Sequence, residues 1–424
     1  MSDRWVVEQA WLGDDVVGPV TLAAIGGRFT DVSLGATDGV PVLAGCAVPG
    51  FVNAHSHAFH RLLRGRTHAA GGDFWTWRDR MYEAAERLDP DLYEEVATAV
   101  FVEMVIAGFT TVGEFHYLHH GPGGEPYSDP NAMGEALISA ARRAGIRIAL
   151  LDAGYFGGSV QDSHLDPVQA RFSDGSVSAW IDRAGDLAKA HADDPDVVIG
   201  LAPHSVRAVP AEALAVLAAR RPEGPLHIHV SEQPAENEAC VAAHGCTPTE
   251  LLDRHGLLGP ATTAVHATHL SENDVQLLGA TGTVVCACPT TEQDLADGLG
   301  PFREIASAGS PLSVGTDSHA SIDPFVEMRG IEMHARIRSG SRGHFSGPEL
   351  LAAATTSGAA SLGFSDAGIT VGAPADFSVV DTSGIRLAPF SGTVDEIVFG
   401  ATAADVHHVV VGGRTIVEGG RHVG

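Results

Sequence analysis

Lysine is almost absent from this chain. Of its 26 basic residues, 25 are arginines and only Lys189 is a lysine, against 53 acidic residues, so that the formal net charge is −27. An excess of negative charge of this size repels phosphate backbones and anionic lipid surfaces. We therefore expect no nucleic-acid partner and no membrane partner.

Cysteine pairs and long apolar runs are also lacking. The cysteines are odd in number and form no CxxC pair, which argues against a disulfide framework and a zinc ribbon. No uncharged apolar run approaches the roughly 18 residues that span a bilayer. The first residues, MSDRWVVEQAWLGDD, have no basic segment followed by an apolar core, as a secretory signal would. We expect a cytoplasmic protein.

Both ends of the chain carry short alternating apolar stretches. They occur between residues 5 and 49, and again at 375–381, 395–400 and 406–420, where Gly412 and Gly413 indicate a hairpin turn. This pattern is typical of small antiparallel strands. We predict that residues 1–48 and 365–424 pair into one discontinuous β-sandwich domain.

The middle of the chain alternates short apolar strands with helical segments such as 93–107 and 211–220. The strand pattern occurs eight times, at 51–57, 111–117, 148–155, 197–204, 226–232, 263–266, 283–289 and 312–317. Eight strands with helices between them indicate an α/β protein with a (β/α)8 TIM barrel, here over residues 49–364. The active site of such a barrel lies at the carboxyl ends of the strands.

Polar residues stand at those strand ends. The chain has 22 histidines, and His55 and His57 close the first strand in positions that project to one side, so both imidazoles can reach one metal ion. Two surface histidines on a loop would be the plainer interpretation of this pair. A metal site is favoured by further candidates at three other strand ends, namely His229 with Glu232, His266, and Asp317.

These motifs resemble those of the amidohydrolase superfamily, metal-dependent hydrolases on a (β/α)8 barrel with a flanking β-sandwich. The resemblance extends to residues 358–381, which look like that superfamily's passage from barrel to sandwich. It implies that His55, His57, His229 and Asp317 bind one metal ion. A second ion needs a bridging lysine after the fourth strand, and Lys189 lies in a helical stretch before that point. Three nitrogens and one carboxylate favour Zn2+, and iron also fits.

The resemblance also implies the reaction. The spacing from His229 to Glu232 is typical of deaminase-like members, in which hydroxide activated by the metal attacks a C=N carbon and a carboxyl protonates the leaving nitrogen. We predict that Glu232 is this general acid. His266 would hydrogen-bond the attacking water or the oxyanion, and Asp317 would accept the water's proton.

Four segments, 55–61, 74–82, 113–120 and 202–209, look like those of the formimidoylglutamate deiminase branch. That branch converts N-formimino-L-glutamate to N-formyl-L-glutamate and ammonia in histidine degradation, so the resemblance implies a small dicarboxylate substrate. Arg78 and Arg207 offer planar forks for two carboxylates. Tyr117 and His204 would complete the carboxylate site. His60 stands where the resemblance predicts glutamine.

Several alternatives stay open. Arg78 lies between tryptophans and could be stacked rather than facing the substrate, in which case Arg80 would take its role. His116, His119 and His120 are predicted to support the site or to be solvated rather than to bind metal, and Cys286 and Cys288 to pack in the barrel. The chain could instead be another mononuclear deaminase, acting on guanine, cytosine or a triazine, or a non-catalytic metal-binding scaffold. We also expect a homodimer.

Overall fold

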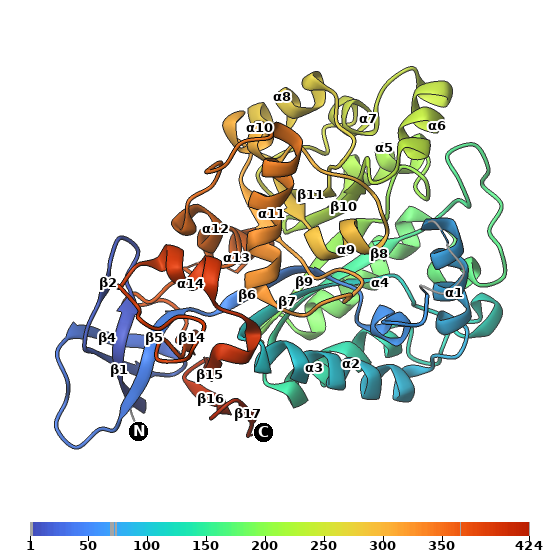
Figure 1. Cartoon of the computed structure of the whole chain (residues 1–424). Coiled ribbons are helices and arrows are strands. Elements are labelled where there is room, and N and C mark those ends of the chain that lie inside the picture. The colour runs from blue at the N-terminus through green and yellow to red at the C-terminus, as the bar shows by residue number, and fades with distance from the viewer. Residues whose placement is uncertain (1–2, 68–71, 73, 365, 424) are drawn as a thin grey trace.

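A closed parallel barrel forms the larger part of the protein (Figure 1). The computed structural model describes residues 3–67, 72, 74–364 and 366–423. The eight strands follow one another around the barrel in chain order and confirm the sequence prediction: β6 (Phe51–Ser56), β7 (Phe109–His116), β8 (Arg147–Gly154), β9 (Val197–Pro203), β10 (Leu226–Val230), β11 (Thr262–His266), β12 (Val284–Ala287) and β13 (Leu312–Val314).

The ring closes between the end of β6 and the residues that follow β13. The Asp317 amide donates to the His55 carbonyl at 3.0 Å, and the His57 amide donates to the Asp317 carbonyl at 3.1 Å. The same backbone bonds that close the barrel therefore place Asp317 beside the two histidines of the first strand.

Helices connect the strands of the barrel, and most of them cover its outside (Figure 1). Their bounds are α1 (Phe74–Ala85), α2 (Pro90–Ile106), α3 (Ala132–Ala144), α4 (Val177–Ala190), α5 (Ala211–Arg220), α6 (Pro234–His244), α7 (Pro248–Arg254), α8 (Glu272–Thr281), α9 (Pro289–Asp294), α10 (Phe302–Ser307), α11 (Pro324–Ser339), α12 (Gly347–Ala353) and α13 (Thr356–Ser361). Helix α3 shows how the sequence sets them. Met133, Leu137, Ile138 and most of its alanines face inward, and Gly145 ends it in a left-handed conformation with φ of 76°.

The two ends of the chain form one second sheet, as predicted. Its strands are β1 (Asp3–Trp11), β2 (Val16–Val17), β3 (Val20–Ile25), β4 (Arg28–Leu34), β5 (Val42–Pro49), β14 (Phe377–Val380), β15 (Val406–Val411), β16 (Arg414–Glu418) and β17 (Arg421–His422). All neighbouring strands pair antiparallel except β1 with β5. Gly412 and Gly413, both at positive φ, form the predicted turn between β15 and β16.

This sheet curls over its own core. Phe29 of β4 and Phe377 of β14 have ring centroids 6.2 Å apart, although three strands separate them in the sheet order. The strand predicted at 395–400 is wrong, because the segment forms helix α14 (Val394–Gly400). Thr393 caps that helix and Glu396 completes a capping box, a local signal that outweighs the strand-like apolar pattern.

Buried polar contacts join the two parts. Arg147, at the start of β8, donates to Asp376 at 2.8 Å, and Ser378 of β14 donates to the carbonyl of Gly108 at 2.8 Å. Among the described residues, no helix is both long and apolar enough to span a membrane.

Candidate active site

Four side chains from three parts of the barrel converge at its carboxyl end. His55 lies on β6, His57 follows that strand, His229 lies on β10, and Asp317 follows β13. Asp317 Oδ1 is 3.5 Å from Nε2 of both His55 and His57. His229 Nε2 is 3.2 Å from His55 Nε2. The structure thus brings together the four residues that the sequence suggests as metal ligands.

Neighbouring carbonyls turn two of these imidazoles so that their Nε2 lone pairs face the cluster. Nδ1 of His57 donates to the Phe115 carbonyl at 2.9 Å, and Nδ1 of His229 donates to the His204 carbonyl at 2.8 Å. Burial lowers the pKa of His57 to about 3 and that of His229 well below its ordinary value. Both rings are therefore neutral, as metal ligands must be.

The donor set fits one divalent ion. Two nitrogen ligands of a tetrahedral zinc ion lie about 3.3 Å apart, given Zn–N bonds of about 2.0–2.1 Å, and His55 and His229 present their nitrogens at 3.2 Å. Two groups of potential donors that include His55 lie here within 4.8 Å, one with His57 and Asp317, the other with His229 and His266. Burial raises the pKa of Asp317 to about 7, so this carboxyl holds a proton more readily than usual until a cation is near.

The backbone is strained at these strand ends. Ser231, His266 and Asp317 adopt positive φ angles of 51°, 68° and 45°. Residues other than glycine rarely occupy this region, and they do so mostly where the fold requires an unusual side-chain direction. At Asp317 this conformation lets the main chain pair with β6 while the carboxylate faces His55 and His57.

His266 lies beside the cluster with carboxylates on both sides. Its Nε2 is 3.7 Å from Glu232 and 3.8 Å from Asp317, and its Nδ1 is 3.7 Å from Glu292. Burial opposes the charge on this ring, but the carboxylates outweigh burial and raise its pKa to about 10. His266 is therefore a cationic donor that faces the site.

Glu232 forms an ion pair with Arg207, which the sequence analysis did not predict. Arg207 Nη2 donates to Glu232 Oε2 at 2.5 Å, and Arg207 Nε is 3.9 Å from Glu236 Oε2. Burial favours the neutral form of Glu232, yet Arg207 and His266 outweigh it and lower the pKa of Glu232. In this structure, Glu232 is the counter-ion of Arg207.

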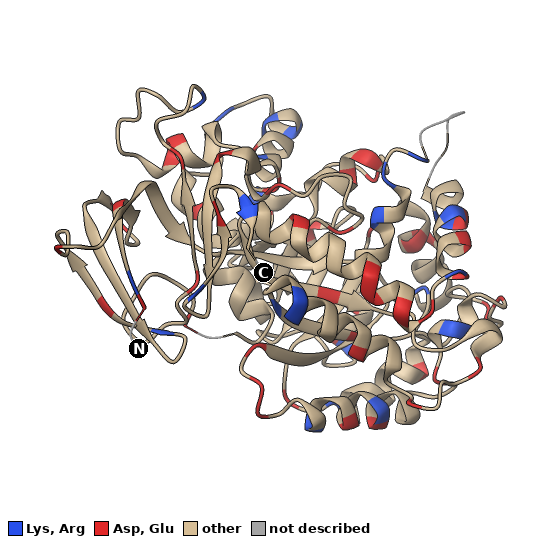
Figure 2. Cartoon of the chain, turned by 90° about the horizontal axis from the view of Figure 1, so that it is seen from below, with Lys and Arg blue, Asp and Glu red and all other residues tan. Residues whose placement is uncertain are grey.

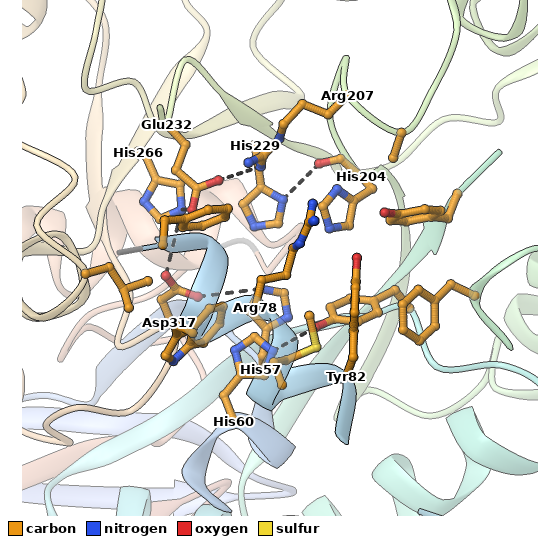
Figure 3. Close-up of a pocket in the computed structure, with 18 of the residues that line it drawn as sticks. His57, His60, Arg78, Tyr82, His204, Arg207, His229, Glu232, His266 and Asp317 are labelled. Atoms are coloured by element: carbon orange, nitrogen blue, oxygen red, sulfur yellow. Dashed lines mark hydrogen bonds and ion pairs between the residues drawn. The ribbon is translucent and has the colours of Figure 1, made fainter. Parts of the chain in front are cut away.

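One cavity contains this chemistry (Figure 3). It encloses about 670 Å3 including its open mouth, which suits a small molecule. Ten residues predicted above as metal-binding, catalytic or substrate-binding groups line it: His57, His60, Arg78, Tyr117, His204, Arg207, His229, Glu232, His266 and Asp317.

Arg78 is both stacked and open to the cavity. Its guanidinium lies 4.7 Å from the centre of the Trp75 ring and 5.5 Å from that of Tyr82. Within the part of the chain that the structure describes, no carboxylate pairs with it, and its Nε has no hydrogen-bond partner. Arg80, the alternative, lies outside this cavity and pairs with Glu83 at 2.9 Å. The position of the two side chains therefore favours Arg78 over Arg80 for this role.

Tyr117 and His60 support each other in the floor of the cavity. The His60 Nε2 atom is 2.7 Å from the Tyr117 hydroxyl, which also contacts the Met81 sulfur at 3.4 Å. Both side chains are buried. The hydroxyl of Tyr117 is thus already hydrogen-bonded to the histidine that stands where glutamine was predicted.

Sequence reasoning missed residues that hold the lining of the site in place. Gln169 donates to the hydroxyls of Tyr82 and Tyr155 at 3.1 and 3.0 Å, which joins α1 to the loop after β8. Glu292 was also missed, although it lies between His266 and His334, at 3.7 and 3.6 Å. The pairs are far apart in sequence, and only the fold brings them together.

Other histidines form a separate buried network. His116, His119 and His120 do not line the cavity, and all three are buried, so solvated positions for them are excluded. His119 is 3.3 Å from His116 and 3.9 Å from Asp152, a carboxylate whose two oxygens already accept from Arg183 at 2.8 Å. Cys286 and Cys288 pack with Ala54 and Val265, as predicted. Lys189 lies in α4 and is exposed.

The chain is similar to known proteins over most of its length. The amidohydrolase family pattern matches residues 46–416. A formimidoylglutamate deiminase from Pseudomonas aeruginosa is 35% identical over 91% of this chain and 88% of its own length. A 5-methylthioadenosine/S-adenosylhomocysteine deaminase from Natronomonas pharaonis is 30% identical over 88% of this chain and 82% of its own.

Solved structures agree with this relationship. The crystal structure of an amidohydrolase from Brucella melitensis superposes with a TM-score of 0.93 at 32% identity, covering 99% of this chain and 96% of that one. An adenosine deaminase from Xanthomonas campestris with bound zinc gives a TM-score of 0.84 at 25% identity, covering 99% and 94%.

Proposed function

The chain belongs to the amidohydrolase family and is a hydrolytic enzyme related to deaminases, and we propose that it hydrolyses N-formimino-L-glutamate to N-formyl-L-glutamate and ammonia, a step of histidine degradation. The observation that carries this proposal is the meeting of two arginines, Arg78 and Arg207, with the histidine and aspartate cluster in one small cavity. A dicarboxylate that carries a C=N group matches both halves of that cavity.

We propose that His55, His57, His229 and Asp317 hold one Zn2+ ion. Iron is the alternative metal for the same four ligands. When bound there, a divalent ion lowers the pKa of a water molecule and polarises the carbon under attack. His266, charged and 3.8 Å from Asp317, is placed to donate a hydrogen bond to the oxygen that adds to that carbon. Asp317 accepts the proton that this oxygen gives up.

Glu232 delivers protons to the nitrogen. Water adds its oxygen to the C=N carbon, and both protons that the nitrogen gains come from this one water molecule. The C–N bond then breaks, its electron pair leaves with the nitrogen as ammonia, and the oxygen forms the C=O bond. A positioned carboxyl accelerates such a transfer by about 10²–10⁴-fold.

A second candidate rests on the aromatic part of the cavity. Phe74, Trp77, Tyr82, Tyr155 and Phe172 line it and could stack against a purine ring. The 5-methylthioadenosine/S-adenosylhomocysteine deaminase from Natronomonas pharaonis makes a nucleoside substrate the natural competitor. Among the described residues Arg78 has no carboxylate partner, and a neutral ring would not supply one, so this arginine favours the dicarboxylate.

A single set of assays separates the two. The purified chain with one equivalent of zinc is given N-formimino-L-glutamate, 5-methylthioadenosine, S-adenosylhomocysteine or guanine, and ammonia release is measured. We expect turnover of the first compound only. Ammonia from a nucleoside or a base at a higher kcat/KM would replace this proposal by the second candidate.

We also propose that the chain forms a homodimer and that it is cytoplasmic. Sedimentation tests the first proposal and cell fractionation the second.

A further inference from the structure

The ion pair between Arg207 and Glu232 conflicts with the two roles proposed for these residues. Arg207 is to bind a carboxylate of the substrate, but its NH2 group already holds Glu232 at 2.5 Å. Glu232 is to carry a proton, but a carboxylate bound to a guanidinium is stabilised in its ionised form. Both side chains are largely buried, with 16% and 7% of their surface exposed, so separating the pair without a new partner for Arg207 would be costly.

We propose that a carboxylate of the substrate replaces Glu232 as the counter-ion of Arg207, and that this exchange of partners releases Glu232 to serve as the proton donor. The inference rests on the proposed function and adds a regulation of the same site. A substrate without the carboxylate would leave the pair intact, so the enzyme would select its substrate through the catalytic step as well as through binding.

The surroundings of Arg207 suit such an exchange. Glu236 is fully buried and its Oε2 accepts from the Glu232 amide at 3.1 Å, so it stays in place when the side chain of Glu232 moves. It lies 3.9 Å from Arg207 Nε and keeps the guanidinium in position. Phe74 lies under the guanidinium, with 5.4 Å between its ring centre and Arg207 Cζ. Arg207 can thus change partners without turning.

Charge also opposes a shared arrangement. Arg207 already faces the carboxyl groups of Glu232 and Glu236. A carboxylate of the substrate would place a further negative charge next to that of Glu232 on the same cation. Burial and Glu232 both raise the pKa of the neighbouring Asp297, to about 8, which shows how poorly this region tolerates more negative charge. Release of Glu232, followed by its protonation with a proton of the attacking water, relieves the repulsion.

The released side chain stays close to the reacting atoms. Its other oxygen, Oε1, lies 3.7 Å from His266 Nε2, on the side of the cavity where the Asp317 carboxylate also lies (Figure 3). A small rotation away from Arg207 therefore moves Glu232 toward the cluster rather than out of the cavity.

Splitting the substrate into two fragments tests the exchange. Formamidine carries the C=N group without a carboxylate, and glutarate carries the two carboxylates without the C=N group. Glutarate is first titrated as an inhibitor of N-formimino-L-glutamate turnover. Ammonia release from formamidine is then measured with and without glutarate, at about ten times its inhibition constant.

We expect glutarate to raise kcat for formamidine by about tenfold or more, within the range of a general-acid contribution. Arg207→Met should change the turnover of the two substrates in opposite directions, whereas a merely structural role would lower both. Its kcat/KM for N-formimino-L-glutamate should fall by about tenfold to a hundredfold, while its turnover of formamidine should rise above that of the unmodified chain and no longer depend on glutarate. Arg80→Met, on the same helix as Arg78 but outside the cavity, is the matched control.

Glutarate that fails to inhibit, or that slows formamidine turnover, would overturn the exchange. Crystals grown with glutarate give a readout independent of turnover, in which we expect glutarate on Arg207 and Glu232 turned away. Glutarate seen with the 2.5 Å pair retained would overturn the inference. If the exchange is seen but N-formimino-L-glutamate is not turned over, the proposed function fails and the exchange of partners stands.

Discussion

At the scale of single residues, the cluster around His55 is built from groups that burial keeps in unusual protonation states. The histidines are neutral because burial lowers their pKa values, whereas the pKa of Asp317 is raised from 3.8 to about 7 by burial. A buried carboxyl that is half protonated near pH 7 becomes fully ionised when a cation binds beside it. The proton on Asp317 therefore competes with a metal ion.

This competition predicts a pH dependence of metal affinity. Below about pH 7 the metal-free chain holds a proton on Asp317 that the ion must expel, so the affinity should fall by about tenfold for each pH unit below 7 and level off above it. The raised pKa of Asp317 also affects the free energy of unfolding of the metal-free chain. The protonated carboxyl contributes stability at low pH, and this contribution is lost as the pH rises through about 7. Competition with a chromophoric chelator between about pH 5.5 and 8 measures the slope.

The control is Asp297→Asn, which removes a second buried carboxyl whose pKa is raised to about 8 but which lies outside the cluster. Its slope should match that of the unmodified chain. An affinity that stays constant between pH 6 and 7, or a slope that disappears in Asp297→Asn, would show that Asp317 is not the group that takes up the proton.

The role of Glu232 as proton donor is tested by Glu232→Gln, which keeps the size of the side chain and removes the transferable proton. We expect kcat to fall by about 10²–10⁴-fold, with metal content unchanged because Glu232 is not among the proposed ligands. Glu238→Gln, exposed on the neighbouring helix α6, is the matched control. A Glu232→Gln enzyme that keeps most of its kcat would transfer the role to His266.

Single residues also show where sequence reasoning ends. The alternation of a strand is enough to predict that His55 and His57 face one ion, because side chains two apart project to the same side. The pairing of Arg207 with Glu232 could not be predicted, since the two residues follow different strands and 25 positions separate them. The carboxyl-end loops of a barrel bring such groups together, and their conformations depend on contacts that no local pattern encodes.

At the scale of elements, the eight barrel strands were predictable because each is a short apolar run between turns, whereas helix α14 was misassigned. Its apolar residues also fit a strand, and only the pair Thr393 and Glu396 marks it as a helix. The contact between Gln169 and Tyr82, which lines the cavity, was missed for a related reason. The loop between β8 and α4 contains little regular structure, so its sequence gave no sign that Gln169 contacts Tyr82 of α1.

Arg171 fixes that loop and the end of α1 together. Its buried guanidinium donates to the carbonyls of Ala85, Leu88 and His120 at 2.5, 2.6 and 2.8 Å. Arg171→Met would leave all three carbonyls without this donor, and we expect it to lower the free energy of unfolding by about 2–4 kcal/mol. Urea denaturation measures the loss, and limited proteolysis should detect earlier cleavage near residues 86–89.

Arg143→Met is the comparison for this experiment. Arg143 is exposed and pairs with Glu94 at 3.1 Å, so its loss should change the free energy of unfolding by less than about 0.5 kcal/mol. Equal stability of the two variants would mean that water or a rearranged backbone replaces the contacts of Arg171, and that the loop is not fastened through this residue.

At the scale of the whole molecule, the charge of the chain opposes the substrate proposed for its cavity. Acidic residues lie on the helices of the barrel and on the second sheet (Figure 2), and the net charge is −27. A field of this sign repels an approaching dicarboxylate, whereas Arg78 and Arg207 attract it only inside the cavity. The long-range repulsion passes through solvent and is screened by salt, with a Debye length of about 10 Å at 0.1 M, but buried contacts are screened much less.

We therefore expect kcat/KM for N-formimino-L-glutamate to rise by about twofold to tenfold as the ionic strength increases from about 10 to 200 mM. Most enzymes that attract their charged substrates over a distance show the opposite sign. Formamidine, which has no negative charge, is the control and should show no increase. Initial rates of ammonia release at low substrate concentration measure both. A kcat/KM that falls with salt for the dicarboxylate would mean that the arginines at the cavity govern the approach as well as the bound state, and that the charge of the remaining surface has no part in selecting the substrate.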